Sequence, residues 1–164
     1  MFEGVVQFDV ALILKHLSRD STGNSKVLFE HLNRSIKQFH FLGPDANDKP
    51  GVVSDGKTVG GNAVQVWCLL RLLPILLYDS VCMQYQAWQM LILLREIVEL
   101  ICAPKVSFAQ ILYLNRLIQE YIEDRSRLFP SVPLRPKHHF FAALPLVDTN
   151  VWATDKRVDH AHGK

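Results

Sequence analysis

The longest apolar stretch of the chain, residues 63–129, reads AVQVWCLLRLLPILLYDSVCMQYQAWQMLILLREIVELICAPKVSFAQILYLNRLIQEYIEDRSRLF. Apolar residues recur in it at spacings of three and four, which is typical of helices that bury a face. Tyr85 to Ala103 is apolar nearly all round and is followed by Pro104, so we expect a helix in the middle of a bundle. Ser107 and Gln110 have the spacing of a capping box and predict the start of a last long helix.

Within this stretch, Ala63 to Tyr78 has a helical pattern that contains Pro74. Proline removes a backbone hydrogen bond and clashes with the preceding turn, so the sequence predicts a kink or a break near Leu73. The buried stripe of the last helix is expected to hold Ile111, Leu114, Ile118, Tyr121 and Ile122.

Side chains along these helices lead to three further expectations. The spacing of one turn predicts ion pairs on the outer faces, Arg95 with Glu99 and Glu123 with Arg127. The aromatic residues expected in the core are Trp67, Trp88 and Phe108. All three cysteines lie in apolar helical patterns without disulfide-framework spacing, which indicates reduced, buried thiols and an intracellular protein: Cys68, Cys82 and Cys102.

The N-terminal third predicts two more helices. Val5 to Leu17 forms the first, and Ser18 to Ser25 is a turn-rich break after it. Ser25 to Phe41 forms an amphipathic helix whose buried stripe is Leu28, Phe29, Leu32, Ile36 and Phe39. Residues 43–62 contain two prolines and five glycines and predict a long loop, which in a compact domain is either functional or mobile.

Beyond Phe129, the prolines at 130, 133 and 136 are expected to exclude helix and to impose an extended path. No run alternates cleanly between apolar and polar residues, and no internal repeat is present. We therefore predict an all-α fold, an irregular bundle of about five helices with a long loop at 43–62 and an extended, proline-rich C-terminal segment. One helical domain is expected over residues 1–141, with its dense core at 63–129, followed by a divergent, flexible tail at 142–164.

Composition narrows the possible functions. The chain has 164 residues and a formal net charge of +2, which is too small to imply wholesale nucleic-acid binding. Its N-terminus has no basic region, and Asp9 interrupts the first apolar run, so no secretory signal is predicted. The apolar stretches Val64–Tyr78 and Trp88–Ala103 contain charged residues or proline, so neither is expected to span a membrane. We expect a protein of the nucleus or cytoplasm that is not secreted.

Residues 51–58, GVVSDGKT, match the phosphate-binding pattern G-x-x-x-x-G-K-[ST]. In a true site, Lys57 would contact the terminal phosphates and Thr58 would bind magnesium. That chemistry requires a buried strand before the loop and a helix starting at the lysine. Residues 45–50 are too polar for such a strand, and Gly60 and Gly61 oppose a helix start. A nucleotide site is therefore the least favoured hypothesis.

Other motifs have ordinary explanations beside the functional ones. His138-His139, and His160 with His162 beside Asp155 or Asp159, could in principle bind a metal, but their spacing favours surface histidines. No G-x-S-x-G turn is present, and cysteines in apolar runs are usually inert. One basic cluster lies beside two phenylalanines and is the candidate nucleic-acid contact: Arg135, Lys137, His138 and His139.

Five blocks of the sequence carry a family resemblance: Phe2–Gln7, Leu32–Ile36, Asn47–Pro50, Gln65–Pro74 and Leu128–Phe140. They look like successive blocks of an animal protein family that derives from DNA transposons and resembles CACTA-type transposases. The resemblance covers about residues 2–141, and its last block is the most specific.

The resemblance implies that this chain corresponds to the part of a transposase that lies between its catalytic residues. In such transposases a ribonuclease-H-like core uses three metal-binding acids, and a helical region is inserted before the last one. An Asp/His motif typically precedes the Glu-Gly block, whereas this chain begins at Met1. A glutamate-containing segment usually follows the Lys-His-His-Phe block, whereas no glutamate follows Trp152, and Asp155 is not expected to substitute. We therefore expect no catalytic acid, no cofactor and no metal.

Two hypotheses about function follow. The first is a transposase-derived helical domain, a fragment without its catalytic residues and not an enzyme, which contacts DNA or a protein partner. The alternative is a generic helical protein–protein interaction module that self-associates or binds a partner through an exposed apolar face. A P-loop nucleotide-binding protein is a distant third.

Overall fold

The computed structural model describes residues 2–22 and 25–138. Its elements are η1 (Phe2–Val6, a π-helical turn), α1 (Gln7–Thr22), α2 (Ser25–Gln38), η2 (Gly43–Ala46, a 3-10 turn), α3 (Ala63–Leu76), α4 (Gln86–Cys102) and α5 (Phe108–Leu128). No strand occurs in these ranges, so the predicted all-α class is confirmed. None of the helices in the same ranges has the length and apolar character needed to cross a membrane.

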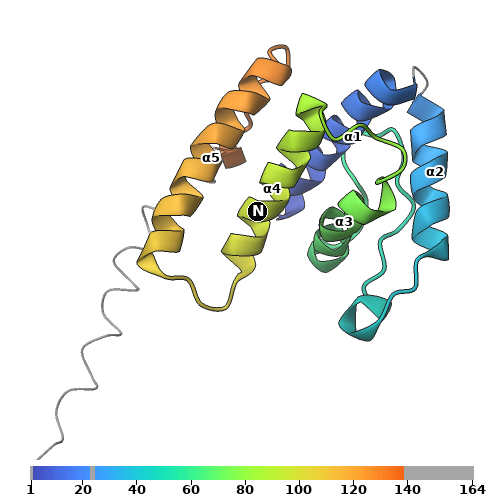
Figure 1. Cartoon of the computed structure of the whole chain (residues 1–164), viewed down its shortest axis with the longest axis horizontal. Helices are drawn as coiled ribbons and strands as arrows, with labels where there is room; N and C mark the ends of the chain where they lie inside the picture. Colours follow the sequence, from blue (N-terminus) through green and yellow to red (C-terminus); the bar gives the residue numbers. More distant parts are fainter. Residues whose placement is uncertain (1, 23–24, 139–164) are drawn as a thin grey trace, which may run out of the picture.

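The helices form an irregular bundle with α4 near its middle (Figure 1). α4 packs against α5 on one side and α1 on the other, and α1 in turn packs against α2. α3 contacts η1, α2 and α4 and closes the remaining side of the core. This central place explains why α4 is apolar nearly all round, since several of its faces meet other helices.

The elements with strong local signals begin and end where the sequence indicates. Ser107 caps α5 with both hydrogen bonds of a capping box, to and from Gln110. Arg95 and Glu99 form the predicted ion pair on α4 at 2.9 Å. The stripes predicted for α2 and α5 face the core, with Phe39 and Ile122 partly buried at their edges.

The predicted break at Ser18 is wrong, because α1 continues without interruption to Thr22. Leu17 and Ser18 are both buried. The Ser18 hydroxyl donates to the backbone oxygen of Lys15 at 2.7 Å, so the polar side chain is satisfied inside the helix. Burial of the preceding apolar residues therefore outweighs the weak helix propensity of this segment. The other predicted break residues, at 23–24, lie outside the described ranges.

A break at Leu73 does not occur either, since α3 runs through Pro74 to Leu76. The proline lies in the last turn of the helix, which ends at Leu76, and Leu77 N still donates to Leu73 O at 3.0 Å. Asn62 provides a second capping box at the start of α3, with Gln65. A proline so close to a helix end costs less than one in the interior because few turns depend on it.

The loop between α2 and α3 is held to the helices at several points. Its Val53 and Val59 side chains are buried in the core. The side chain of Asn33 exchanges two hydrogen bonds with the backbone of Val53, at 2.7 and 2.8 Å. Ion pairs join the loop to the bundle at two further places, Lys15 with Asp55 and Arg71 with Asp45. The loop is therefore part of the packed structure over much of its length.

Several side chains differ from expectation. Phe108, predicted to be in the core, is 67% exposed at the first position of α5, whereas Trp88 is buried. Cys82 and Cys102 are exposed and only Cys68 is buried, because Cys82 lies in the α3–α4 connection and Cys102 ends α4. Arg127 pairs with Asp124 at 3.2 Å instead of the predicted Glu123.

The segment after α5 turns back toward α1. Val132 N donates to Phe129 O at 3.0 Å, which forms a turn, and residues 133–135 are irregular. Residues 136–138 then have helical backbone, so the expectation that the prolines exclude helix does not hold there. Proline is compatible with the first helical position because its missing N–H has no partner in that turn.

Candidate functional site

The most elaborate polar arrangement is a group of four buried side chains that we call the Asp9 cluster: Asp9, Tyr121, Arg125 and His138. All four are fully buried. The Asp9 carboxylate accepts hydrogen bonds from the Tyr121 hydroxyl at 2.7 Å, from Arg125 Nε at 3.0 and 3.1 Å, and from His138 Nε2 at 2.9 Å. The cluster therefore joins α1, α5 and the segment after α5.

The backbone around His138 selects the form of its ring. Arg135 N donates to His138 Nδ1 at 3.0 Å, so Nδ1 is the acceptor. The proton then resides on Nε2, which donates to Asp9, and the ring is neutral. Arg125 Nη1 donates to Val132 O at 3.2 Å and holds the same segment at a second point. One negative and one positive charge balance in the interior.

Burial, followed by the nearby negative charge of Asp9, raises the pKa of Tyr121 well above its usual value. The phenol therefore stays a hydrogen-bond donor to Asp9. An aspartate, a tyrosine and a histidine are residue types used in acid–base catalysis. Here none of them reaches the surface, so no substrate can contact them. The arrangement is a structural tie between distant segments.

The sequence reasoning missed the Asp9 cluster. A signal was present, since Asp9 is the one acidic residue in the apolar run of the first helix. A second signal was Arg125, one turn after Tyr121 on the predicted buried stripe. A carboxylate and a guanidinium at apolar positions of two helices are most simply explained as partners.

The residues of the predicted nucleic-acid cluster do not share one environment in the structure. His138 is buried in the Asp9 cluster, so its ring is unavailable to a phosphate, which corrects that part of the prediction. Both of its nitrogens are already engaged, which also removes it as a metal ligand. His139 lies outside the described residues, as do the tail histidines His160 and His162.

The two remaining members of that cluster, Arg135 and Lys137, are exposed. The Arg135 guanidinium stacks over the ring of Phe8 with its carbon 3.7 Å from the centroid. The Lys137 side chain passes so close to Gly4 that a Cβ added there would lie 2.6 Å from it. Both cations therefore reach the surface from a segment packed against the N-terminal elements.

The phosphate-binding pattern does not form a phosphate-binding loop. No strand precedes residues 51–58, and the next helix begins only at Ala63. Its amides have other partners, since Gly56 N donates to Ser54 O at 2.8 Å and Val53 N donates to Asn33. Lys57 and Thr58 are exposed and are not at a helix start. The context that the chemistry requires is absent from this described segment.

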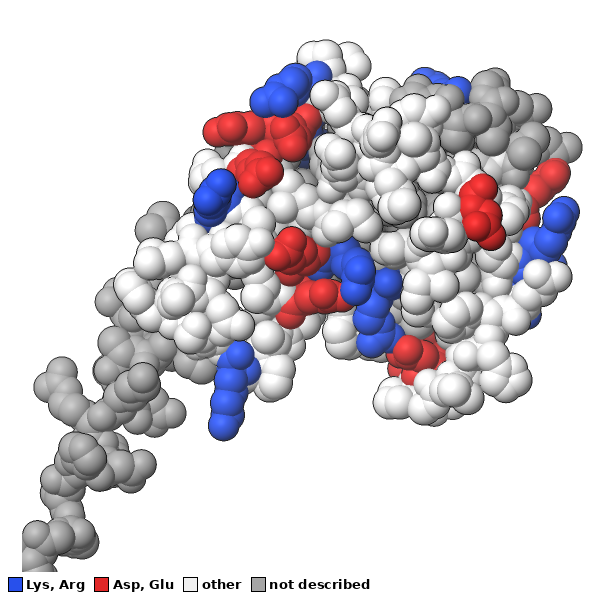
Figure 2. Space-filling model, viewed as in Figure 1, with Lys and Arg blue, Asp and Glu red and all other residues white. Residues whose placement is uncertain are grey.

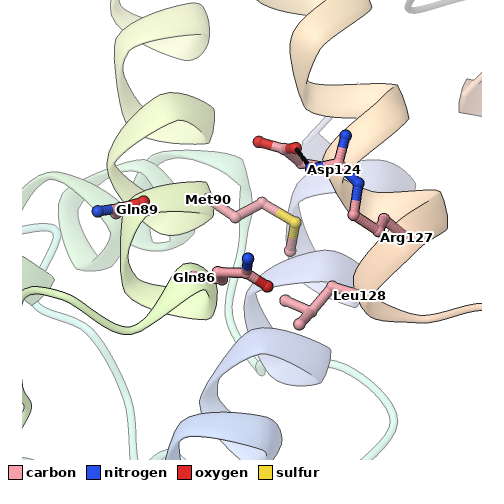
Figure 3. Close-up of a pocket in the computed structure, with 6 residues that line it drawn as sticks. All are labelled: Gln86, Gln89, Met90, Asp124, Arg127 and Leu128. Atoms are coloured by element: carbon pink, nitrogen blue, oxygen red, sulfur yellow. Dashed lines mark ion pairs between the residues drawn. The ribbon is translucent and has the colours of Figure 1, made fainter.

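A cleft lies between the start of α4 and the end of α5 (Figure 3). Met90 points into it from α4, and the ion pair of Asp124 and Arg127 lies at its α5 side. Its volume of about 160 Å³ is below that of a typical small-molecule pocket. The remaining lining residues are Gln86, Gln89 and Leu128.

Within residues 2–22 and 25–138, no three His, Cys, Asp or Glu side chains converge in a way that would hold a metal ion. Burial raises the pKa of the Cys68 thiol, the buried cysteine of α3. A raised pKa lowers the thiolate fraction and hence the reactivity of that side chain.

The outer side of α5 carries a row of uncharged residues that we call the α5 stripe: Phe108, Leu112, Asn115 and Gln119. Their spacing of four, three and four places them on one face of the helix. Leu112 is 55% exposed, Gln119 is exposed and Asn115 is half-buried. In the view of Figure 2, charged side chains gather over the C-terminal half of α5, while its N-terminal half is uncharged.

Comparison with protein-family models, curated proteins and solved structures finds no match for this chain. The transposase-like resemblance therefore stays a prediction from its five sequence blocks.

Proposed function

We propose that this chain is a non-catalytic helical interaction module, derived from a transposase-like protein, that binds another protein through the α5 stripe. The single observation that carries the proposal is the exposure of Phe108 and Leu112 on the first two turns of α5. Large apolar side chains that neighbour each other on a surface are typical of interaction sites. The rest of the proposal comes from the sequence resemblance.

The neighbouring residues support a protein partner over a nucleic acid. The four stripe residues carry no charge, and Arg116 is the one cation between residues 106 and 119, which is little for a phosphate backbone. On another face of α5, Tyr113 donates its hydroxyl to Glu96 at 2.8 Å, which links α5 to α4. The stripe is thus an uncharged surface with an apolar first half on a helix whose neighbouring face is packed, as in helix-in-groove or coiled-coil recognition.

The proposal is tested by photocrosslinking in cells that express the full chain. A benzophenone amino acid replaces Leu112 in one variant and Ile75, an exposed apolar residue of α3, in the matched control. We expect a discrete covalent adduct from position 112 and none from position 75. Equal labelling at both positions, or none at either, would rule out the α5 stripe as the interaction surface.

A second candidate, contact with DNA, has one observation in its favour: Arg135 and Lys137 are exposed two residues apart on a segment that is hydrogen-bonded to α1 and α5. Two cations predict weak binding whose logarithmic salt slope is about 2. Duplex binding is measured across a salt series for the wild type and for the double variant Arg135→Gln, Lys137→Gln. A wild type without affinity at low salt would eliminate DNA contact.

A further inference from the structure

The charged residues at the two ends of the α5 stripe have opposite signs. Lys105 lies just before α5, while Glu120 and Glu123 lie beyond the last stripe residue. Between them Arg116 is the only charged residue, and it lies beside the stripe and not on it. The uncharged row therefore has a positive end and a negative end.

Position along the helix relates these charges to a common midpoint. The stripe from Phe108 to Gln119 is centred between Tyr113 and Leu114. At 1.5 Å per residue, Glu120 and Glu123 are about 10 and 14 Å after this midpoint. Lys105 lies on the other side of the midpoint, in the connection that precedes Phe108.

We propose that the partner of the α5 stripe is the α5 stripe of a second copy of this chain, running antiparallel to the first. In this register Phe108 faces Gln119 of the second copy, and Leu112 faces its Asn115. Lys105, which precedes the helix, then lies toward the end of the opposite helix that carries Glu120 and Glu123. This inference rests on the proposed function, since both require the stripe to be an interaction surface.

Two-fold symmetry makes each of these contacts occur twice. Residue i of one copy meets residue j of the other, and j meets i, so a single complementary arrangement serves both subunits. A parallel pair would place Lys105 beside Lys105 and the glutamates beside glutamates, which is unfavourable. In the antiparallel register Arg116 is level with Ile111 of the other helix, which is buried in its own subunit, so no second cation lies opposite it. The positions of these charges therefore favour a second copy of this chain in the antiparallel orientation over the parallel one.

The bundle leaves the required face of α5 accessible. α5 lies at the edge of the bundle (Figure 1), and its main contacts among the described elements are with α4. The buried residues Ile111, Leu114, Ile118 and Tyr121 centre about 110° around the helix from the stripe, so the stripe flanks the packed face of α5. An antiparallel pair of this length buries a small area, so we expect a reversible dimer.

The test is sedimentation equilibrium of the purified full chain over a range of concentrations. We expect the average mass to rise from 18.8 kDa toward twice that value. Leu112→Glu places carboxylates on both sides of the midpoint and should weaken association at least about tenfold. The matched control is Ile75→Glu, which changes an apolar residue that is 63% exposed on α3 and should leave association unchanged. Circular dichroism checks that both variants remain folded.

Charge reversal tests the direction. Lys105→Glu should weaken the dimer, and combining it with Glu120→Lys and Glu123→Lys should restore it. A monomeric wild type, equal effects of Leu112→Glu and Ile75→Glu, or no restoration in the triple variant would each overturn the proposal. The photocrosslinking experiment separates the two levels: an adduct of another mass from position 112 contradicts self-pairing alone, whereas the absence of any adduct contradicts both.

Discussion

The Asp9 cluster allows a sharp test of how the fold is held together. Among the described residues, Arg125 is the one permanent cation that contacts the Asp9 carboxylate, and replacing it with Leu removes that charge. Tyr121 and His138 would remain as neutral donors, so a buried negative charge would lose its compensation. Breaking a buried ion pair by removing one partner costs about 3–5 kcal/mol. This is a large share of the roughly 5–15 kcal/mol that stabilises a typical domain.

The matched control is Arg127→Leu, two residues along the same helix. The side chain of Arg127 is 68% exposed and pairs with Asp124 on the surface, while that of Arg125 is fully buried. Exposed ion pairs contribute about 0–1 kcal/mol. The two variants therefore change the same residue type in the same helix, and burial is the main difference between them.

Equilibrium unfolding in urea, followed by circular dichroism, measures both free energies. For a chain of this size, Arg125→Leu should lower Tm by about 6–20 °C, while Arg127→Leu shifts it by about 4 °C at most. If the two variants lose the same free energy of unfolding, the reasoning about the Asp9 cluster is refuted. A loss below about 1 kcal/mol for Arg125→Leu would refute it as well.

Three further predictions concern stability. Tyr121→Phe should cost about 1.5–3 kcal/mol, since it removes a hydrogen bond to a charged carboxylate. Because the pKa of Tyr121 is raised in the folded state, its contribution to the free energy of unfolding is fully present below about pH 10 and is lost above it, by up to 1.4 kcal/mol per pH unit. Unfolding measured at several alkaline pH values should therefore show that the stability of the wild type falls more steeply with pH than that of Tyr121→Phe. Equal slopes for the two proteins would contradict this. Asn33→Ala removes both hydrogen bonds to Val53 and should cost about 1–3 kcal/mol with faster amide exchange at Val53, so an unchanged exchange rate argues against this anchor. Leu91→Ala, in the middle of α4, should cost about 2–5 kcal/mol in denaturant unfolding, whereas Leu42→Ala, on the surface, should be close to neutral; similar losses would place the core elsewhere.

The sequence alone predicts a contact correctly where the two interacting residues are neighbours on one helix. Ser107 and Gln110 are three positions apart, and Arg95 and Glu99 are four apart, so the helix itself brings each pair together. The same holds for the buried stripe of α5, because helical periodicity alone determines which side chains share a face.

The sequence alone does not predict the burial or the partner of a side chain when these are determined by distant parts of the chain. Asp9 and Arg125 are 116 positions apart, and nothing local to either one identifies its partner. His138 looked like part of a basic surface cluster because its neighbours are basic, yet its burial is decided by α1 and α5. Ser18 has weak helix propensity, but the packing of Leu17 keeps it helical. Phe108 looked like core because its hydrophobicity says nothing about which way the helix faces.

The hydrogen bond between Asp9 and His138 spans 129 positions and so encloses almost all of the described chain. Closing so long a segment is entropically unfavourable until most of it is already compact. Contacts between α4 and α5, which adjoin in sequence, require far shorter closures and should form early. We therefore expect the Asp9–His138 contact to form among the last, after α1 has docked on α4. The segment that contains His138 can then attach only after α1 has docked, so the two ends of the described chain become ordered together.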